Sequence, residues 1–501
     1  MAINVTATVS SVIINLAINF FLTPYIVSRL GVSAYGFVGL ASNIIGYSQL
    51  ITIALNSMAG RFITIKYAQG NIDEANEYFS SVFYSNLFLS AAIILVFGIG
   101  IIYIDSYLDI PENLVFDVKC LCSLLLCNTI IGLMTNVYAV ATFIKNRLEL
   151  GAIRNMIGNM VRAMLVFSFF YLFVPKLWYI GLASLVSTTY VSFTNYKFKQ
   201  RLTPALLISK YLFSLKKVKE LLISGLWNLI SKLGDLLQRG FDLLFANIFI
   251  GASEMGILSL TTFVPYLILL FFSTISSNFA PILTVAYANG DIIKITHELH
   301  KSIRLMSVVL LVPLSVLYVY GDVFYSLWIP SQNSILLYHL TICGTFALFF
   351  TLPFESFWNL FMVTNKIKYS SLYVLFNSIA VFVTVVGLLM IVDDSIGKMF
   401  VIASTKSIWG VFRGIFFLPI YGAKCLNLKW NYFYKYSRKP VVVLIVGIIA
   451  LYQIRLLFMP DGWISFFVAS VIIALLSLTM SMTIILSSEE RHALIAILRK
   501  K

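Results

Sequence analysis

Charged residues are scarce in this chain, and acidic residues are scarcer than basic ones. Only 11% of the 501 residues are charged, with 21 acidic against 36 basic side chains, while 60% are hydrophobic. A soluble protein carries roughly 25% charged residues. Because the polar surface here is too small to cover a water-soluble globule, most of the surface must face lipid. The composition therefore predicts an integral membrane protein.

Cysteine and histidine are also rare, and their placement argues against two kinds of site. The 5 cysteines are odd in number and four of them lie in apolar runs, so we expect no disulfide framework. The pair His297 and His300 lacks the spacing of a zinc protease, and we expect neither a metal site nor a cofactor. The sequence has no Gly-Lys-Ser/Thr phosphate loop, which argues against ATP as the direct energy source.

Apolar runs of about 20 residues or more are typical of transmembrane helices. The chain has such runs at 7–29, 34–57, 79–104, 116–143, 151–173, 177–196, 220–249, 252–282, 303–320, 333–363, 370–391, 396–420, 440–458 and 462–487. No basic region precedes the first run, so we interpret it as a span rather than a signal peptide. We expect an all-α polytopic membrane protein of about 14 transmembrane helices.

Basic residues lie mostly on one side of this predicted topology. Those in the loops of the other side are few, namely Arg29, Lys119, Lys176, Lys398 and Arg455. By the positive-inside rule both termini are then cytoplasmic. The net charge of +15 reflects this orientation, and we expect no nucleic acid partner.

Three short motifs recur in the second half of the chain at offsets of 219 or 220 residues. They are Gly-Val-Ser-Ala-Tyr-Gly at 31–36 and Gly-Ala-Ser-Glu-Met-Gly at 251–256, Tyr-Ala-Gln-Gly-Asn-Ile at 67–72 and Tyr-Ala-Asn-Gly-Asp-Ile at 287–292, and Ile-Pro at 110–111 and 329–330. Because six spans separate the copies, each half enters the membrane from the same side. The pattern predicts two six-helix lobes related by a parallel internal repeat, plus two extra C-terminal helices.

This repeat divides the chain into four predicted parts. They are an N-terminal lobe at 1–197 (spans 1–6), a cytoplasmic amphipathic linker at 198–219, a C-terminal lobe at 220–421 (spans 7–12), and the extra spans 13–14 with a cytoplasmic tail at 422–501. Thr203 and Pro204 are typical of a helix start. We expect an amphipathic helix there, lying on the inner membrane face.

The seventh predicted span carries a stripe of polar residues. Asn228, Lys232, Asp235, Arg239 and Asp242 are spaced 4, 3, 4 and 3 residues apart, which places them on one helical face. A charge at mid-bilayer costs about 2.5–3.5 kcal/mol, so this face must meet protein or a water-filled cavity. Two alternatives stay open: the four charges neutralise one another as a packing network, or they line a cavity that binds a ligand.

Other predicted spans carry polar residues that can converge with the stripe on one cleft. These candidates are Asn15, Asn19, Gln49, Asn56, Asn155, Asn159, Arg162, Glu355, Asn359 and Lys406. If the cations line the cleft, the passenger is anionic. Arginine suits a phosphate because its planar fork makes two parallel charge-assisted hydrogen bonds. Arg413, near the end of its span, is better explained by snorkelling.

Several local motifs carry a resemblance to a known family. They are Leu-Gly-Val-Ser-Ala-Tyr-Gly at 30–36, Arg-Phe-Ile at 61–63, Tyr-Ala-Gln-Gly-Asn at 67–71 and Tyr-Ser-Leu-Trp-Ile at 325–329. With them the chain resembles the Wzx-type polysaccharide or O-antigen flippases of the multidrug/oligosaccharidyl-lipid/polysaccharide exporter (MOP) superfamily. The resemblance implies twelve core helices in two lobes, a cationic central cavity and an alternating-access cycle coupled to an ion gradient, H⁺ or Na⁺.

The same resemblance implies a cargo and a setting. The cargo is an undecaprenyl-pyrophosphate-linked oligosaccharide, moved across the bacterial cytoplasmic membrane for the synthesis of O-antigen, lipopolysaccharide or capsule. It suggests that the pyrophosphate meets Arg162, Lys232, Arg239 and Lys406, and that ion coupling or cation holding involves Asp235, Asp242 and Glu355. Membrane lipids, a polysaccharide polymerase and a chain-length regulator are the expected partners.

Two other functions fit a chain of this kind. A multidrug or cation antiporter of the same superfamily would favour an acidic cavity, whereas the intramembrane cations here outnumber the acids. A membrane-embedded glycan polymerase or ligase usually needs a sizeable outer loop with catalytic groups, and the predicted outer loops are short. We therefore expect a transporter and not an enzyme.

Overall fold

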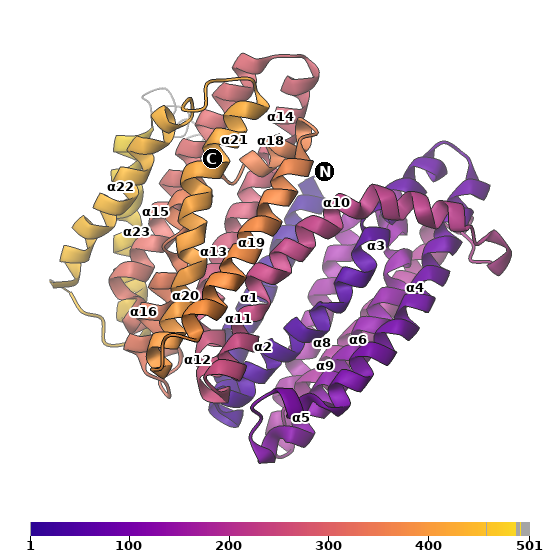
Figure 1. The fold of residues 1–501 in the computed structure, drawn as a ribbon, viewed down its shortest axis with the longest axis horizontal. Coiled ribbons are helices and arrows are strands. Elements are labelled where there is room, and N and C mark those ends of the chain that lie inside the picture. Colours follow the sequence, from indigo (N-terminus) through magenta and orange to yellow (C-terminus); the bar gives the residue numbers. More distant parts are fainter. Residues whose placement is uncertain (1, 457, 487–490, 492–501) are drawn as a thin grey trace. The chain divides into compact units, whose positions relative to one another are not determined.

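The computed structural model describes residues 2–456, 458–486 and 491 of the chain. Within these ranges the secondary structure consists of helices and short helical turns, with no strand (Figure 1). The predicted fold class, an all-α polytopic membrane protein, is confirmed.

Eleven helical segments among the described residues are long and apolar enough to cross a membrane. A twelfth is added if α2 (Val32–Gly46) and α3 (Ser48–Ala68), which meet at a bend of 54°, form one span. The expected spans at 177–196 and 220–249 are not among them. The first corresponds to α9 (Trp178–Leu202), which is rich in Ser, Thr and Lys, and the second carries the charged stripe. The number fourteen stays a prediction.

Contacts divide the chain into two compact units, Met1–Ser259 and Leu260–Lys501. The main helices of the first unit, besides α2, α3 and α9, are α1 (Ala2–Leu30), α4 (Ile72–Ile102), α6 (Val115–Asn136), α8 (Leu148–Leu172), α10 (Leu215–Arg239), α11 (Phe241–Phe249) and α12 (Ala252–Thr261). Helix α1 packs on α8, α6 on α9, and α10 on α3. The seventh predicted span, α10 and α11, thus packs within the first unit, although the predicted C-terminal lobe begins at 220.

The linker differs from the expected amphipathic helix. Between α9 and α10 the only helical turn is the short 3-10 turn η3 (Lys210–Leu212). Side chains of α4 bind this stretch of backbone instead: Asn76 accepts from the Leu207 N–H at 2.8 Å and donates to the Ala205 carbonyl at 3.2 Å. Ser80 and Ser81 make similar bonds to residues 207, 209 and 214. These bonds replace those that a helix would make within itself.

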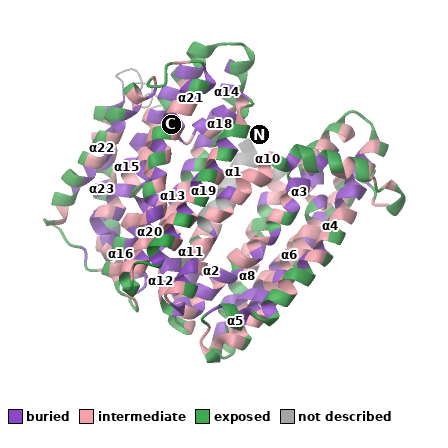
Figure 2. Cartoon of the chain, in the orientation of Figure 1, coloured by how far each residue is buried: buried purple, intermediate pink, exposed green. Residues whose placement is uncertain are grey.

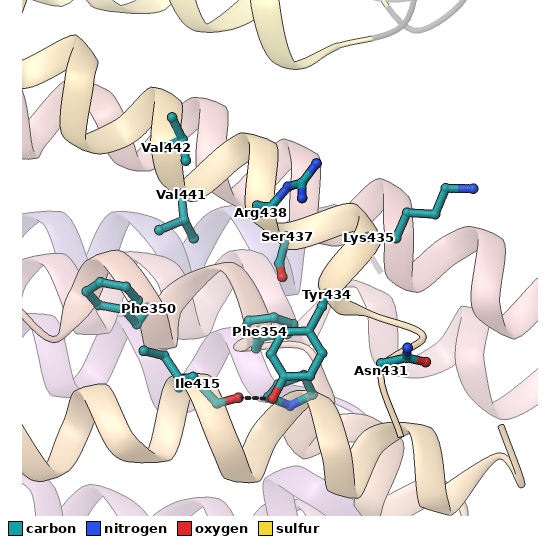
Figure 3. A pocket seen from close by; sticks show the side chains of 12 residues that line it. Phe350, Phe354, Ile415, Asn431, Tyr434, Lys435, Ser437, Arg438, Val441 and Val442 are labelled. Carbon is teal, nitrogen blue, oxygen red and sulfur yellow. Dashed lines mark hydrogen bonds between the residues drawn. The ribbon is translucent and has the colours of Figure 1, made fainter. Parts of the chain in front are cut away.

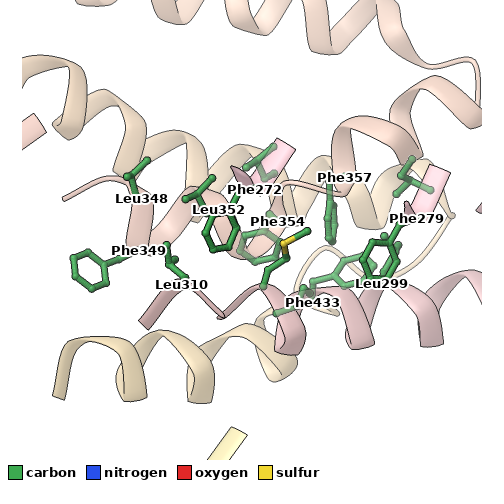
Figure 4. Close-up of a cluster of buried hydrophobic side chains, with 14 of the residues drawn as sticks. Phe272, Phe279, Leu299, Leu310, Leu348, Phe349, Leu352, Phe354, Phe357 and Phe433 are labelled. Atoms are coloured by element: carbon green, nitrogen blue, oxygen red, sulfur yellow. The ribbon is translucent and has the colours of Figure 1, made fainter. Parts of the chain in front are cut away.

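Helix α15 (Ile292–Trp328) is the centre of the second unit. The other elements there are α13 (Phe263–Ser277), α14 (Phe279–Ala288), α16 (Ser334–Thr345), α17 (Leu348–Thr351), η4 (Leu352–Phe354), α18 (Phe357–Val363), α19 (Ile367–Leu389), α20 (Ser395–Phe412), the π-helical turn η5 (Arg413–Phe417), α21 (Leu418–Cys425), α22 (Tyr434–Tyr452) and α23 (Trp463–Ile485). The expected extra spans, α22 and α23, both pack on α15. Figure 4 shows part of the core, in which Phe272, Phe357 and Phe433 are fully buried.

Local geometry supports the predicted repeat. Residues with positive φ match at offsets of 219 or 220: Gly31 (87°) with Gly251 (152°), Gly70 (78°) with Gly290 (68°), and Asn146 (51°) with Asn365 (55°). Asn71 caps α4 by accepting the N–H of Glu74, and Asp291 caps α15 by accepting the N–H of Lys294. Helices α4 and α15 therefore begin in the same way, while the repeat itself stays a prediction.

Candidate functional site

Arg162 lies on α8, within the candidate span 149–172, and its guanidinium reaches α1. One of its NH2 groups donates to the Asn19 side-chain oxygen at 3.2 Å. Asn19 in turn donates to the carbonyl and side-chain oxygens of Asn15, at 3.0 and 3.3 Å. The packing of α1 on α8 thus brings three predicted site residues together in the first unit.

The hydrogen bond to Asn19 uses only part of the Arg162 fork. Its Nε atom is buried and has no hydrogen-bond partner within the described structure. Charged side chains within spans are costly, and those that persist usually face the protein interior or a water-filled path. The amide of Asn19 is neutral, so this hydrogen bond orients the cation without neutralising it.

A second polar contact joins two interrupted spans of the first unit. The bend between α2 and α3 falls at Tyr47, and the seventh predicted span is interrupted at Gly240, between α10 and α11. The Tyr47 hydroxyl donates to the Gly240 carbonyl at 2.8 Å. A Cβ at position 240 would lie 2.8 Å from the Tyr47 ring, so the contact requires glycine there. Interrupted helices at membrane depth often mark binding sites.

This Tyr47–Gly240 contact was not predicted from the sequence. A glycine within each apolar run, Gly46 beside Tyr47 and Gly240 in the charged stripe, was the available signal. A single sequence does not tell which tyrosine reaches such a glycine.

The polar stripe is only partly described by the structure. Asn228 and Lys232 are partly buried on α10. Asp242 lies in the first turn of α11, where a carboxylate interacts favourably with the helix dipole. The side chains of Asp235 and Arg239 lie outside the described residues, although their backbone belongs to α10. The roles proposed for the stripe stay predictions.

Two predicted cavity residues make amide contacts that also suit a packing role. Asn56 and Asn86 donate to each other's side-chain oxygens at 2.9 and 3.0 Å, joining α3 to α4. In the second unit Asn359 donates to the carbonyl and hydroxyl oxygens of Ser276, at 2.9 and 3.1 Å. These bonds satisfy polar groups inside each unit, which favours structure over cargo contact for Asn56 and Asn359.

The other candidates are spread over several helices. Gln49 and Asn155 are exposed, while Asn159 on α8 is partly buried. In the second unit Glu355 lies between η4 and α18, and Lys406 lies on α20, both partly buried. Their convergence with Arg162 on one cleft stays a prediction.

A buried cation on α8 was missed by the sequence. Arg154, two turns before Arg162 and near the start of the predicted span 151–173, was not among the candidate site residues, but its side chain is only 7% exposed. Its Nε and one terminal nitrogen are buried without a hydrogen-bond partner in the described structure. The spacing of eight residues from Arg162 was the available signal, because it places the two cations on nearly one face of α8.

Comparison with known proteins places this fold. No family model matches the chain. An uncharacterized membrane protein named EpsK, from Bacillus subtilis (strain 168), is 26% identical over 501 residues, covering 99% of this chain and 98% of the relative.

Two solved structures are similar along nearly their full length. The lipid II flippase MurJ, in an inward closed conformation, aligns with a TM-score of 0.70 at 13% identity, covering 96% of this chain and 98% of MurJ. An inward-facing multidrug resistance MATE family transporter of the MOP superfamily aligns with a TM-score of 0.62 at 15% identity, covering 90% and 99%. The chain therefore shares the fold of these transporters.

Proposed function

We propose that this protein is a flippase that moves an undecaprenyl-pyrophosphate-linked oligosaccharide from the inner to the outer leaflet of a bacterial cytoplasmic membrane. The observation that carries the proposal is Arg162, an intramembrane cation that a neutral amide, Asn19, holds in place. The fold that the chain shares with the lipid II flippase MurJ supports a lipid-linked cargo.

The pyrophosphate is the part of this cargo that the site would bind. A guanidinium matches two phosphate oxygens in a fork geometry, and it is more weakly hydrated than an ammonium group. In the proposed cycle Arg162, Lys232, Arg239 and Lys406 bind the pyrophosphate. Asp235, Asp242 and Glu355 hold these cations or bind the coupling ion, H⁺ or Na⁺, as the two lobes alternate between inward- and outward-open states.

A multidrug antiporter is the second candidate function, and the likeness to a MATE family transporter favours it. A cationic drug needs an acidic or aromatic site. Among the residues singled out within the predicted spans, however, the cations Arg162, Lys232, Arg239, Lys406 and Arg413 outnumber the acids Asp235, Asp242 and Glu355. This balance favours an anionic cargo.

Deletion of the gene distinguishes the two functions. We expect the deletion strain to accumulate lipid-linked repeat units in the inner leaflet and to lose the corresponding surface polysaccharide, with little change in drug sensitivity. Complementation with the intact gene should restore the polysaccharide. Normal surface glycan together with lost resistance to cationic drugs would overturn the flippase proposal in favour of the antiporter.

The proposed orientation has both termini in the cytoplasm. In a cysteine-free background, single cysteines replacing the exposed residues Glu112, Ser331 and Asp393 should react with an impermeant thiol reagent added to intact cells. Cysteines replacing the exposed residues Lys216 and Asn289 should not react. The opposite labelling pattern would invert the orientation.

A further inference from the structure

The second unit contains an open pocket of about 490 Å³, and none of the predicted cargo residues is among the residues that line it. Three parts of the chain form it: α17 with η4, the π-helical turn η5 with α21, and the start of α22. Its walls are mostly apolar and include Phe350, Phe354, Ile415, Val441 and Val442 (Figure 3). The volume is within the range of about 300–1,000 Å³ that is typical of small-ligand sites.

The π-helical turn gives this pocket its shape. Gly414, within η5, packs closely on α17. A Cβ at position 414 would lie 2.5 Å from the Phe350 carbonyl oxygen. The Tyr434 hydroxyl donates to the Ile415 carbonyl at 2.5 Å, which fixes the start of α22 against the turn. Single π-turns within α-helices occur often at functional sites. These contacts join the three parts of the chain that form the pocket.

The open edge of the pocket is basic. Lys435 and Arg438 both line the pocket, both are exposed, and their side chains leave α22 at this edge (Figure 3). The side-chain amide of Asn431 lies at the same edge. The segment 424–439 also contains Lys424, Lys429 and Lys439, and the sequence has no acidic residue between 395 and 460.

An apolar pocket with a cationic edge, at the end of a membrane span, matches one class of ligand. We propose that this pocket binds an anionic phospholipid of the bilayer, with its phosphate at Lys435 and Arg438. The upper part of an acyl chain lies along Phe350, Val441 and Val442. Basic pockets between spans on the cytoplasmic side are typical sites for anionic headgroups. The positive-inside rule places this edge at the inner leaflet.

Native mass spectrometry of the full-length protein, purified in detergent, tests the proposal. The probes are phosphatidylglycerol and phosphatidylcholine with identical acyl chains. We expect phosphatidylglycerol to bind in preference. In the double variant K435Q/R438Q this preference should fall about tenfold, because each cation near an anionic headgroup contributes up to about fivefold in affinity.

The matched control is K424Q/K429Q. It removes the same charge from the same segment, at two exposed residues that do not line the pocket. We expect it to keep the preference. Equal binding of both lipids by the wild-type protein, or an equal loss in both double variants, would overturn the proposal and leave only a general attraction to the basic surface.

Two further measurements separate a pocket from a surface. Val442→Trp places a large side chain into the pocket at a residue that is 52% exposed, so folding should be unaffected while lipid retention falls. Size-exclusion and thermal unfolding profiles check the folding of each variant. If undecaprenyl phosphate binds but phosphatidylglycerol does not, the pocket belongs to the cargo and the proposal is wrong.

Discussion

Helices α4 and α15 occupy matching positions in the predicted repeat, yet their surroundings differ. Both begin at a capped residue after a glycine with positive φ. The most apolar window of α15 is 61% buried, whereas that of α4 is 22% buried (Figure 2). Helices α22 and α23 cover α15, while Phe88 and Leu95 on α4 are exposed. The two extra helices thus convert a lipid-facing helix into the core of the second unit.

The two helices also differ in the ion pairs near their C-terminal ends. Asp322 on α15 binds Arg455 through two hydrogen bonds of 2.7 and 2.6 Å, and both side chains are largely buried. Asp105, just beyond α4, pairs with Lys119 at 2.8 Å, and both are substantially exposed. A partly buried pair that loses one member leaves an uncompensated charge, whereas an exposed pair leaves a solvated one.

The largest expected effect is therefore on the pair that joins α15 to the extra helices. Asp322→Ala should lower the stability of the protein by about 3 kcal/mol, because Arg455 is left without its carboxylate. The measurement is the free energy of unfolding in detergent. Removing both members, Asp322→Ala with Arg455→Ala, should recover part of the loss.

Asp105→Ala is the matched control for this prediction, since it removes the carboxylate from the exposed pair with Lys119. We expect no measurable change in its unfolding. Equal destabilisation by Asp105→Ala and Asp322→Ala would show that the C-terminal ends of α4 and α15 depend equally on their ion pairs. That result would contradict the comparison.

A smaller effect is expected from replacing a glycine on α22, which packs on α15, and a glycine on α4. A Cβ at Gly447 on α22 would lie 2.4 Å from Met480 and 3.3 Å from Leu311, whereas nothing lies within 4 Å of one at Gly100 on α4. Gly447→Leu should cost about 1–3 kcal/mol from overpacking. Gly100→Leu should be neutral or stabilising, because it gains a similar helix propensity without the steric cost.

Thermal unfolding of the two glycine variants in the same detergent measures this difference. If Gly447→Leu unfolds at the wild-type temperature, α22 does not pack on α15 as closely as described.

The smallest expected effects are local and concern contacts made near the N-terminal ends of α4 and α15. Asn76 on α4 holds the linker by hydrogen bonds at residues 205 and 207. His300 on α15, at the position that matches Ser80, stacks on Tyr436 with ring centroids 3.4 Å apart. Asn76→Ala should reduce amide protection around 205–209 about fivefold, since each hydrogen bond contributes about 1 kcal/mol.

Hydrogen exchange measured by mass spectrometry separates the two contacts. His300→Ala should loosen the segment around Tyr436 and leave the linker unchanged, and Asn76→Ala should do the reverse. Loosening of both segments by either variant would mean that these contacts are not local.

The sequence predicted the apolar framework well because the spacing of apolar runs is a property of each segment alone. The expected C-terminal pair at 440–458 and 462–487, for example, corresponds to α22 and α23. The linker was predicted wrongly as a helix because its pattern is amphipathic, but Asn76, Ser80 and Ser81 of α4 supply the hydrogen bonds that its backbone needs. Such long-range bonds leave no trace in local periodicity.

The candidate site was harder to predict for the same reason. Polar spacing drew attention to Arg162 and Asn19, which are 143 residues apart and are bonded in the structure. It could not distinguish them from Asn56, whose partner Asn86 lies on the neighbouring helix. It also did not single out Arg154, because a cation near the end of a span is usually solvated, whereas this one is buried.

The central claim is that Arg162 binds a phosphate-bearing cargo, and its fork geometry gives the most direct test. The measurement is surface polysaccharide restored in the deletion strain by Arg162→Lys and Arg162→Met, normalised to the amount of folded protein in the membrane. Arg29→Lys, the same change at an exposed position on α1, is the control and should restore wild-type levels. We expect Arg162→Lys to lower transport about tenfold, because the charge remains but the fork is lost, and Arg162→Met to abolish it. Near-normal transport by a well-folded Arg162→Met protein would contradict the claim.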